Sequence, residues 1–89
     1  MTLKQWCLDT AAAYRRRAYE VSDIFGEPLG LCALVSQAWW AGELSLSDES
    51  TLRHAISLLP NVYYNFKWSR DDVGFDERAD WLEEYAESI

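Results

Sequence analysis

This chain has few residues of the kinds that bind metals, cross-link a fold or break helices: one histidine, two cysteines, two prolines and four glycines in 89 residues. Cys7 and Cys32 have no C-x-x-C spacing, and His54 is far from both, so a zinc site is not expected. Both cysteines lie among apolar residues of predicted helices, which favours two buried free thiols over one disulfide. Free thiols indicate a reducing compartment.

Long apolar runs and catalytic motifs are missing as well. The most apolar run, Leu29 to Val35, is too short to span a bilayer, and no apolar segment of a signal peptide follows Met1. The sequence contains no G-x-S-x-G, glycine-rich phosphate loop, H-E-x-x-H or Cys/His pair, and the lone His54 is expected to be structural or exposed. We therefore expect a cytoplasmic protein that is not an enzyme and has no cofactor, metal or membrane contact.

Apolar and aromatic side chains, by contrast, are plentiful. The sequence is 49% hydrophobic and contains five tryptophans, five tyrosines and three phenylalanines. A chain of this length forms one domain, and large aromatic side chains supply much of the buried area that so small a domain needs. We expect a single helical domain over residues 1–89.

Apolar residues spaced three and four positions apart predict four helices joined by short connections. Start and stop signals stand at their ends. The predicted fold is all-α, a compact single-domain arrangement resembling a four-helix bundle. The predicted helices are Leu3 to about Val21 with Thr2 as N-cap, Leu29 to Ala41 with Pro28 in its first turn and Gly42 after its end, Ser45 or Ser47 to Pro60, and Glu77 to Ser88 with Asp76 as N-cap.

One segment departs from the helical period. Between residues 62 and 69, Val62, Tyr64, Phe66 and Trp68 occupy every second position, which is typical of a strand. No second segment alternates as clearly, and an unpaired strand exposes its backbone donors and acceptors. The segment is either an extended aromatic connector laid across the helices or an edge that pairs with another subunit or target.

The charge of the chain is concentrated at one end. Of the net charge of −7, all is carried by residues 71–89, which hold eight acids and one base. At about 100° per residue, six of these acids fall within a sector of about 120° on the last helix, bordered by a tryptophan. This surface is the predicted partner-binding site. It consists of Asp76, Glu77, Asp80, Trp81, Glu83, Glu84 and Glu87.

Local energetics favour a functional role for this surface over an ordinary solvated one. Asp80 has acids four residues before and after it, Asp76 and Glu84, and each such pair is unfavourable by roughly 0.2–0.5 kcal/mol. Acids in the last turn also oppose the helix dipole, and Arg78 projects towards another side. A rigid row of carboxylates resembles a phosphate backbone in charge. The expected partner is therefore a basic protein surface, such as a nucleic-acid-binding groove.

The arginine triplet offers an alternative within the molecule. Arg15, Arg16 and Arg17 point three ways around the first helix, so one or two of them can neutralise acids of the last helix. Arg17 lies nearest the apolar stripe and is expected either to be partly buried with a carboxylate partner or to extend its charged end to the solvent. Three bases in an acidic chain do not favour direct binding of nucleic acid.

Two other functions stay open. The protein could sequester a small nucleotide, with aromatic rings stacking on the base and an arginine binding the phosphate; it could also be an adaptor whose acidic tail only confers solubility. The residues for nucleotide binding would be Tyr63, Tyr64, Trp68 and Trp40 with Arg15 or Arg16. The sequence does not indicate an oligomeric state.

Several short words in the sequence resemble small proteins of bacteriophages. They are Gly30 to Leu34, the turn Gly42 to Ser45, Leu58-Leu59-Pro60 and Arg78 to Leu82. Phage-encoded inhibitors of host defence, including anti-CRISPR proteins, are similar in being short, acidic, single-domain and non-enzymatic. The resemblance implies an inhibitor of a host defence complex that acts in the host cytoplasm, and it assigns no functional residue.

Overall fold

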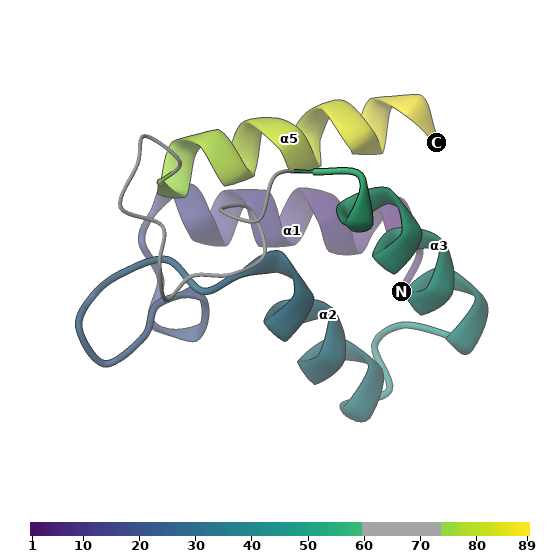
Figure 1. Cartoon of the computed structure of the whole chain (residues 1–89), viewed down its shortest axis with the longest axis horizontal. Coiled ribbons are helices and arrows are strands. Elements are labelled where there is room, and N and C mark those ends of the chain that lie inside the picture. The colour runs from purple at the N-terminus through teal and green to yellow at the C-terminus, as the bar shows by residue number, and fades with distance from the viewer. Residues whose placement is uncertain (60–73) are drawn as a thin grey trace.

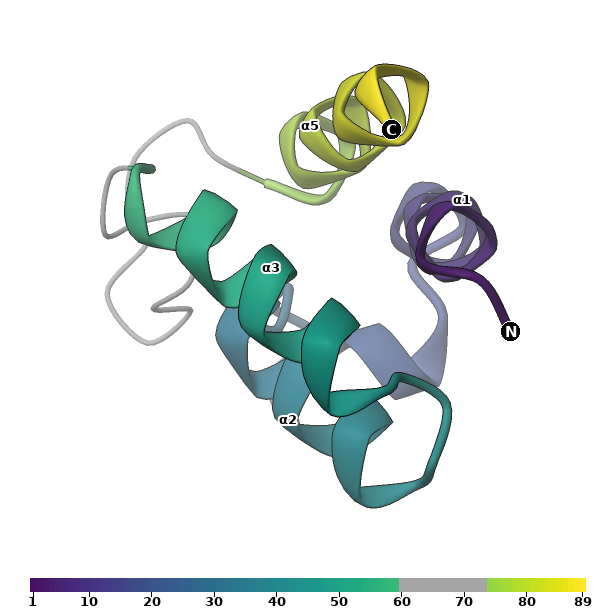
Figure 2. The ribbon, with the colours of Figure 1, turned by 90° about the vertical axis from the view of Figure 1, so that its right-hand side faces the viewer.

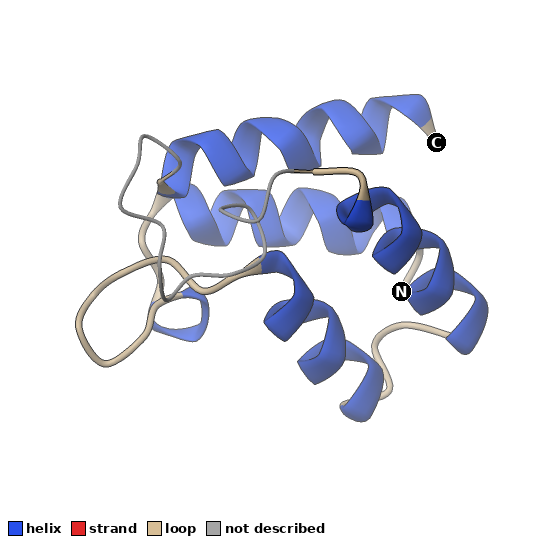
Figure 3. Cartoon of the chain, in the orientation of Figure 1, coloured by secondary structure: helices blue, strands red, loops and turns tan. Residues whose placement is uncertain are grey.

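The structure of the protein, a computed structural model, describes residues 1–59 and 74–89. In chain order it contains α1 (Leu3–Arg15), the short 3-10 helix η1 (Tyr19–Val21), α2 (Leu31–Trp40), α3 (Leu46–Ser57) and α5 (Phe75–Ser88) (Figures 1 and 3). The described residues form no strand beyond one isolated bridge, so the all-α prediction is confirmed. The predicted strand or connector at 62–69 lies outside the described residues.

The helices pack as two antiparallel pairs. α1 packs mainly against α5, and α2 packs mainly against α3. The two ends of the chain lie on the same side of the molecule, because α5 runs back along α1 (Figures 1 and 2). This pairing places the acidic last helix beside the C-terminal end of the first, where the arginine triplet stands.

Each helix contributes fully buried side chains to one core. Tyr14 of α1, Leu31 of α2, Leu52 of α3 and Leu82 of α5 are all 0% exposed. They lie on the apolar stripes that the spacing of three and four residues predicts. Cys7 is buried and Cys32 is half-buried, and both are free thiols, as expected from the sequence.

α1 is shorter than the sequence predicted, since it ends at Arg15 and not near Val21. Arg17 has a φ of 52°, and the N–H of Ala18 donates to the carbonyl of Ala13 at 3.0 Å. A residue in the left-handed region with this hydrogen bond is the Schellman end of a helix, which usually uses glycine. Because an arginine takes that position here, no glycine marked the end in the sequence.

The start of α2 also differs from the prediction. Pro28 pairs with Ser22 in the isolated bridge, and the helix begins only at Leu31, after the N-cap Gly30. The N–H of Leu29 donates to Val21 at 2.9 Å, so the residues before α2 close a loop and do not form its first turn. The other end is as predicted: Gly42, with a φ of 77°, follows α2 in the left-handed conformation.

The two remaining helix starts show one correct cap and one wrong one. Ser45 caps α3, because its hydroxyl accepts from the N–H of Asp48 at 3.1 Å. Asp76 was expected to cap the last helix, but α5 begins at Phe75 with Gly74 as N-cap. The Glu77 carboxylate accepts from the Gly74 N–H at 2.7 Å. A side chain three residues into the helix therefore takes the capping role.

We expect Tyr14→Phe to lower the free energy of unfolding by about 1–3 kcal/mol, because it leaves the partly buried carbonyl of Leu29 without its donor. The Tyr14 hydroxyl donates to that carbonyl at 2.5 Å and so fastens α1 to the segment before α2. Urea denaturation measures the change. Tyr19→Phe is the matched control, since Tyr19 is 92% exposed, and equal stability of the two variants would contradict the prediction.

The two thiols should differ in reactivity, because Cys7 is buried and Cys32 is only half-buried. Burial raises the pKa of Cys7 to about 12, so at pH 8 this thiol is protonated as well as inaccessible. With a disulfide reagent, the native protein should therefore react at Cys32, and Cys7 should react only after unfolding. Reaction of native Cys32→Ser at the rate of a free thiol would contradict this.

Candidate functional site

α5 has one buried side and one charged side. Ala79, Leu82 and Ala86 are 0% exposed and form its apolar stripe in the core. Arg78, which the sequence placed away from the acids, is also fully buried, and its guanidinium donates to the carbonyl of Gly74 at 3.3 Å. The single base of this helix thus lies inside the protein and away from the acidic surface.

Arg15, the last residue of α1, binds three acids of α5. Its Nε and Nη2 atoms donate to the two carboxylate oxygens of Glu83 at 3.0 and 2.7 Å. Nη2 also donates to Asp80 at 2.5 Å, and Nη1 lies 3.7 Å from Asp76. The contact with Glu83 is bidentate, the geometry in which arginine binds a carboxylate most strongly. Arg15 also stands at the negative C-terminal end of the α1 helix dipole, which stabilises its positive charge.

The other two arginines of the triplet differ in what they contact. Arg17 lies 3.4 Å from a carboxylate oxygen of Asp76 and 5.3 Å from the centre of the Phe75 ring. Arg16 pairs with Glu20 at 3.0 Å, away from α5. Two arginines therefore neutralise part of the acidic helix. Arg17 has the carboxylate partner expected for it, but the expectation that it is partly buried is wrong, because its side chain is 53% exposed. Arg15, at 39%, is less exposed and makes the closer contacts.

These contacts shift the titration of the groups that they join. The hydrogen bonds from Arg15 hold the pKa of Glu83 below its usual value, and the bonds to Glu83 and then Asp80 raise the pKa of Arg15. The side chains of Arg15 and Glu83 are 39% and 42% exposed, so water and salt screen the pair. We call Arg15, Arg17, Asp76, Asp80 and Glu83 the arginine network.

The rest of the predicted surface has other surroundings. Glu77 is engaged as the capping side chain, and Trp81 is half-buried against the core, with its ring stacked on Tyr85 at 5.2 Å between centroids. Glu84 and Glu87 are exposed and make no ion pair or side-chain hydrogen bond within the described residues. We call Glu84 and Glu87 the open carboxylates. Of the predicted site, they are the acids left available to a partner.

Of the residues expected for nucleotide binding, the structure describes Trp40, Arg15 and Arg16. Arg15 faces α5, whereas Trp40 is 80% exposed and packs edge-on against Trp39. Tyr63, Tyr64 and Trp68 lie outside the described residues. Across residues 1–59 and 74–89, no group of three or more potential ligands from His, Cys, Asp and Glu gathers to hold a metal. None of the described helices has the length and apolar character needed to cross a membrane.

The sequence identified the acids and the arginine triplet that can neutralise them, but it favoured Arg17, whereas Arg15 makes the closer contacts. The sequence offered one signal for Arg15: it stands near the end of a helix whose partner helix carries acids at the i, i+3 spacing of Asp80 and Glu83. This spacing points to Arg15 only when it is known that the two helices pack side by side and antiparallel. Comparison with known protein families, curated proteins and solved structures found no match to this chain.

We expect Arg15→Gln to lower the melting temperature more than Arg16→Gln, because it leaves three facing carboxylates without their shared base. Each variant removes one charge, and the side-chain pair of Arg16 is confined to one exposed turn with Glu20. The difference should shrink in molar salt, which screens exposed pairs. Equal melting of the two variants at low salt would contradict the prediction.

The loss of melting temperature in Arg15→Gln, measured against wild type, should become smaller as the pH is lowered. The pKa of Glu83 is lowered in the folded protein, so the stabilisation is present above the ordinary value of 4.5 and is lost as the pH falls through the folded value. The melting temperatures of wild type and Arg15→Gln should therefore converge progressively as the pH falls below 4.5.

Proposed function

We propose that this protein is a non-enzymatic inhibitor that docks the open carboxylates of α5 on a basic, nucleic-acid-binding surface of another protein. The observation that supports it is the division of the acidic helix. Arg15 engages Asp76, Asp80 and Glu83, while Glu84 and Glu87 extend beyond the network with both carboxylates exposed.

The arginine network supports this proposal by fixing the helix that carries the open carboxylates. Arg15 joins α1 to α5 across 68 residues of sequence, and the buried stripe of α5 holds the same two helices together. A partner then meets carboxylates on a rigid helix and does not have to order a flexible tail, which would cost affinity. The network also leaves an excess of acid, since two bases face three acids.

Charge supports a basic partner over nucleic acid. The described residues carry the whole net charge of −7, because the remaining positions 60–73 hold two acids and two bases. A field of this sign repels a phosphate backbone and steers a cationic surface towards the protein. Trp81, beside the open carboxylates on the helix, adds partly exposed aromatic surface of the kind that interfaces use as an anchor.

The proposed target is a nucleic-acid-binding complex of a host cell. A groove built for phosphates already contains the arginines and lysines that a row of carboxylates needs. The resemblance to short, acidic phage proteins that inhibit host defence agrees with this class of target. In such a role the protein acts in the host cytoplasm by occupying the groove and performs no chemistry.

The test is a charge reversal confined to the open carboxylates. In Glu84→Lys/Glu87→Lys we expect capture of basic proteins from a bacterial lysate to fall about tenfold at low salt, because the complementary charge is lost. Proteins captured by the wild type should be displaced by duplex DNA or RNA. Quantitative mass spectrometry of the captured proteins, with and without nucleic acid, measures both effects.

The matched control is Glu27→Lys/Glu43→Lys, which changes the net charge by the same amount on other elements. Both side chains are exposed and make no ion pair or side-chain hydrogen bond in the part of the chain described. This control should keep its nucleic-acid-binding partners. If both double variants lose them equally, general acidity and not α5 is responsible, and the proposal fails. It also fails if nucleic acid displaces nothing from the wild type.

A further inference from the structure

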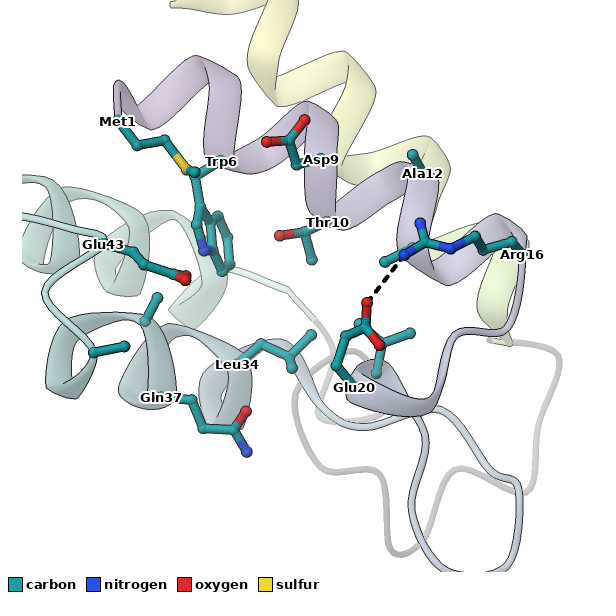
Figure 4. Close-up of a pocket in the computed structure, with 14 residues that line it drawn as sticks. Met1, Trp6, Asp9, Thr10, Ala12, Arg16, Glu20, Leu34, Gln37 and Glu43 are labelled. Atoms are coloured by element: carbon teal, nitrogen blue, oxygen red, sulfur yellow. Dashed lines mark hydrogen bonds and ion pairs between the residues drawn. The ribbon is translucent and has the colours of Figure 1, made fainter.

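A second feature lies on the other side of α1, away from the acidic helix. α1 and α2 border a pocket of about 560 Å³, which is within the usual size of small-molecule sites (Figure 4). Buried apolar side chains line part of it, among them Val21, Leu34 and Ala38. The pocket shares no residue with the arginine network or the open carboxylates. Binding of a ligand in it is therefore independent of the docking proposed for α5.

Trp6 gives this pocket an unused donor. Its side chain lines the pocket and is only 5% exposed, yet its indole N–H makes no hydrogen bond within residues 1–59 and 74–89. The indole nitrogen itself is not fully buried, so water or a ligand oxygen can reach it from the pocket. Figure 4 shows the indole reaching from α1 towards α2, with its nitrogen at the end of the pocket where Glu43 lies. The donor is therefore placed to meet a molecule bound there.

Glu43 places a hydrogen-bond acceptor with a negative charge in the same pocket. It stands in the loop after α2, and its carboxylate points into the pocket and has no ion-pair partner in the described part of the chain (Figure 4). Asp9 adds a second acid from α1, with one oxygen accepting from the amide of Gln5 at 2.8 Å. The one arginine among the lining side chains, Arg16, is paired with Glu20 at 3.0 Å. Among the charged side chains that line the pocket, Glu43 is the one without a partner in the described part of the chain, and its negative charge favours a cation.

We propose that this pocket binds a small organic cation that carries a protonated amine next to a hydroxyl or carbonyl oxygen. The amine pairs with the carboxylate of Glu43, and the neighbouring oxygen accepts the hydrogen bond of the Trp6 indole N–H. The apolar part of the ligand lies against Val21, Leu34 and Ala38. An amine alone makes one of these two polar contacts, and an anion meets the carboxylates of Glu43 and Asp9, so both fit the pocket less well.

Three related molecules test the two polar contacts separately. They are 2-amino-1-phenylethanol, which has both groups, 2-phenylethylamine, which lacks the hydroxyl, and 1-phenyl-1,2-ethanediol, which lacks the amine. Protein labelled with ¹⁵N-tryptophan gives one indole N–H signal for each of its five tryptophans, and Trp6→Phe identifies the signal of Trp6. The amino alcohol should shift this signal saturably at millimolar concentration. Each of the other two should bind about tenfold more weakly.

Two variants locate the effect in the pocket. Glu43→Gln should weaken binding of the amino alcohol about tenfold, since it removes the charge that pairs with the amine, whereas Glu27→Gln should leave it unchanged. The proposal is overturned if the Trp6 signal does not move, if Glu43→Gln binds as tightly as wild type, or if all three molecules bind equally. Equal binding would mean that only the phenyl ring is recognised.

Discussion

The antiparallel contact of α1 with α5 is the constraint on which the rest of the structure depends. It joins the two ends of the chain, buries Leu82 and its neighbours on α5, and sets Tyr14 against Phe75 at 6.3 Å between ring centres. From the same position the Tyr14 hydroxyl bonds Leu29, which fixes the segment leading into α2. Placement of the second helix pair is thus linked to the packing of the first and last helices.

The contact of α1 with α5 also reduces the repulsion between the acids of α5. Like charges at i,i+4 and acids near a helix C-terminus are unfavourable, and the one base of α5, Arg78, is buried in the core. Arg15 offsets the repulsion where Asp76, Asp80 and Glu83 face α1. The offset does not extend to Glu84 and Glu87. Their repulsion is best explained if these two acids serve a partner, as we propose.

α1 therefore separates two surfaces of different chemistry. On one side it holds α5 and the arginine network, and on the other it borders the pocket that Trp6 and Glu43 line. The arginine triplet at its C-terminal end serves both sides, since Arg15 turns to α5 and Arg16 borders the pocket in its pair with Glu20. The left-handed turn at Arg17 ends the helix at the point where these directions diverge.

The sequence by itself determined the helices, because their signals act within one turn of chain: the spacing of apolar residues, the caps at Thr2 and Ser45, and the glycine after α2. It misplaced the end of α1, where Arg17 takes a position that usually needs glycine, and the start of α2, where Pro28 belongs to a loop. It also misplaced the start of α5, where Glu77 has the capping role expected of Asp76. Within the acidic surface it identified the residues but not their division. Only the tertiary structure decided that, since the bonds of Arg15 span 65 and 68 positions and exist only once the two helices pack. Only the tertiary structure formed the pocket as well, because Trp6 lies on α1 and Glu43 in the loop after α2.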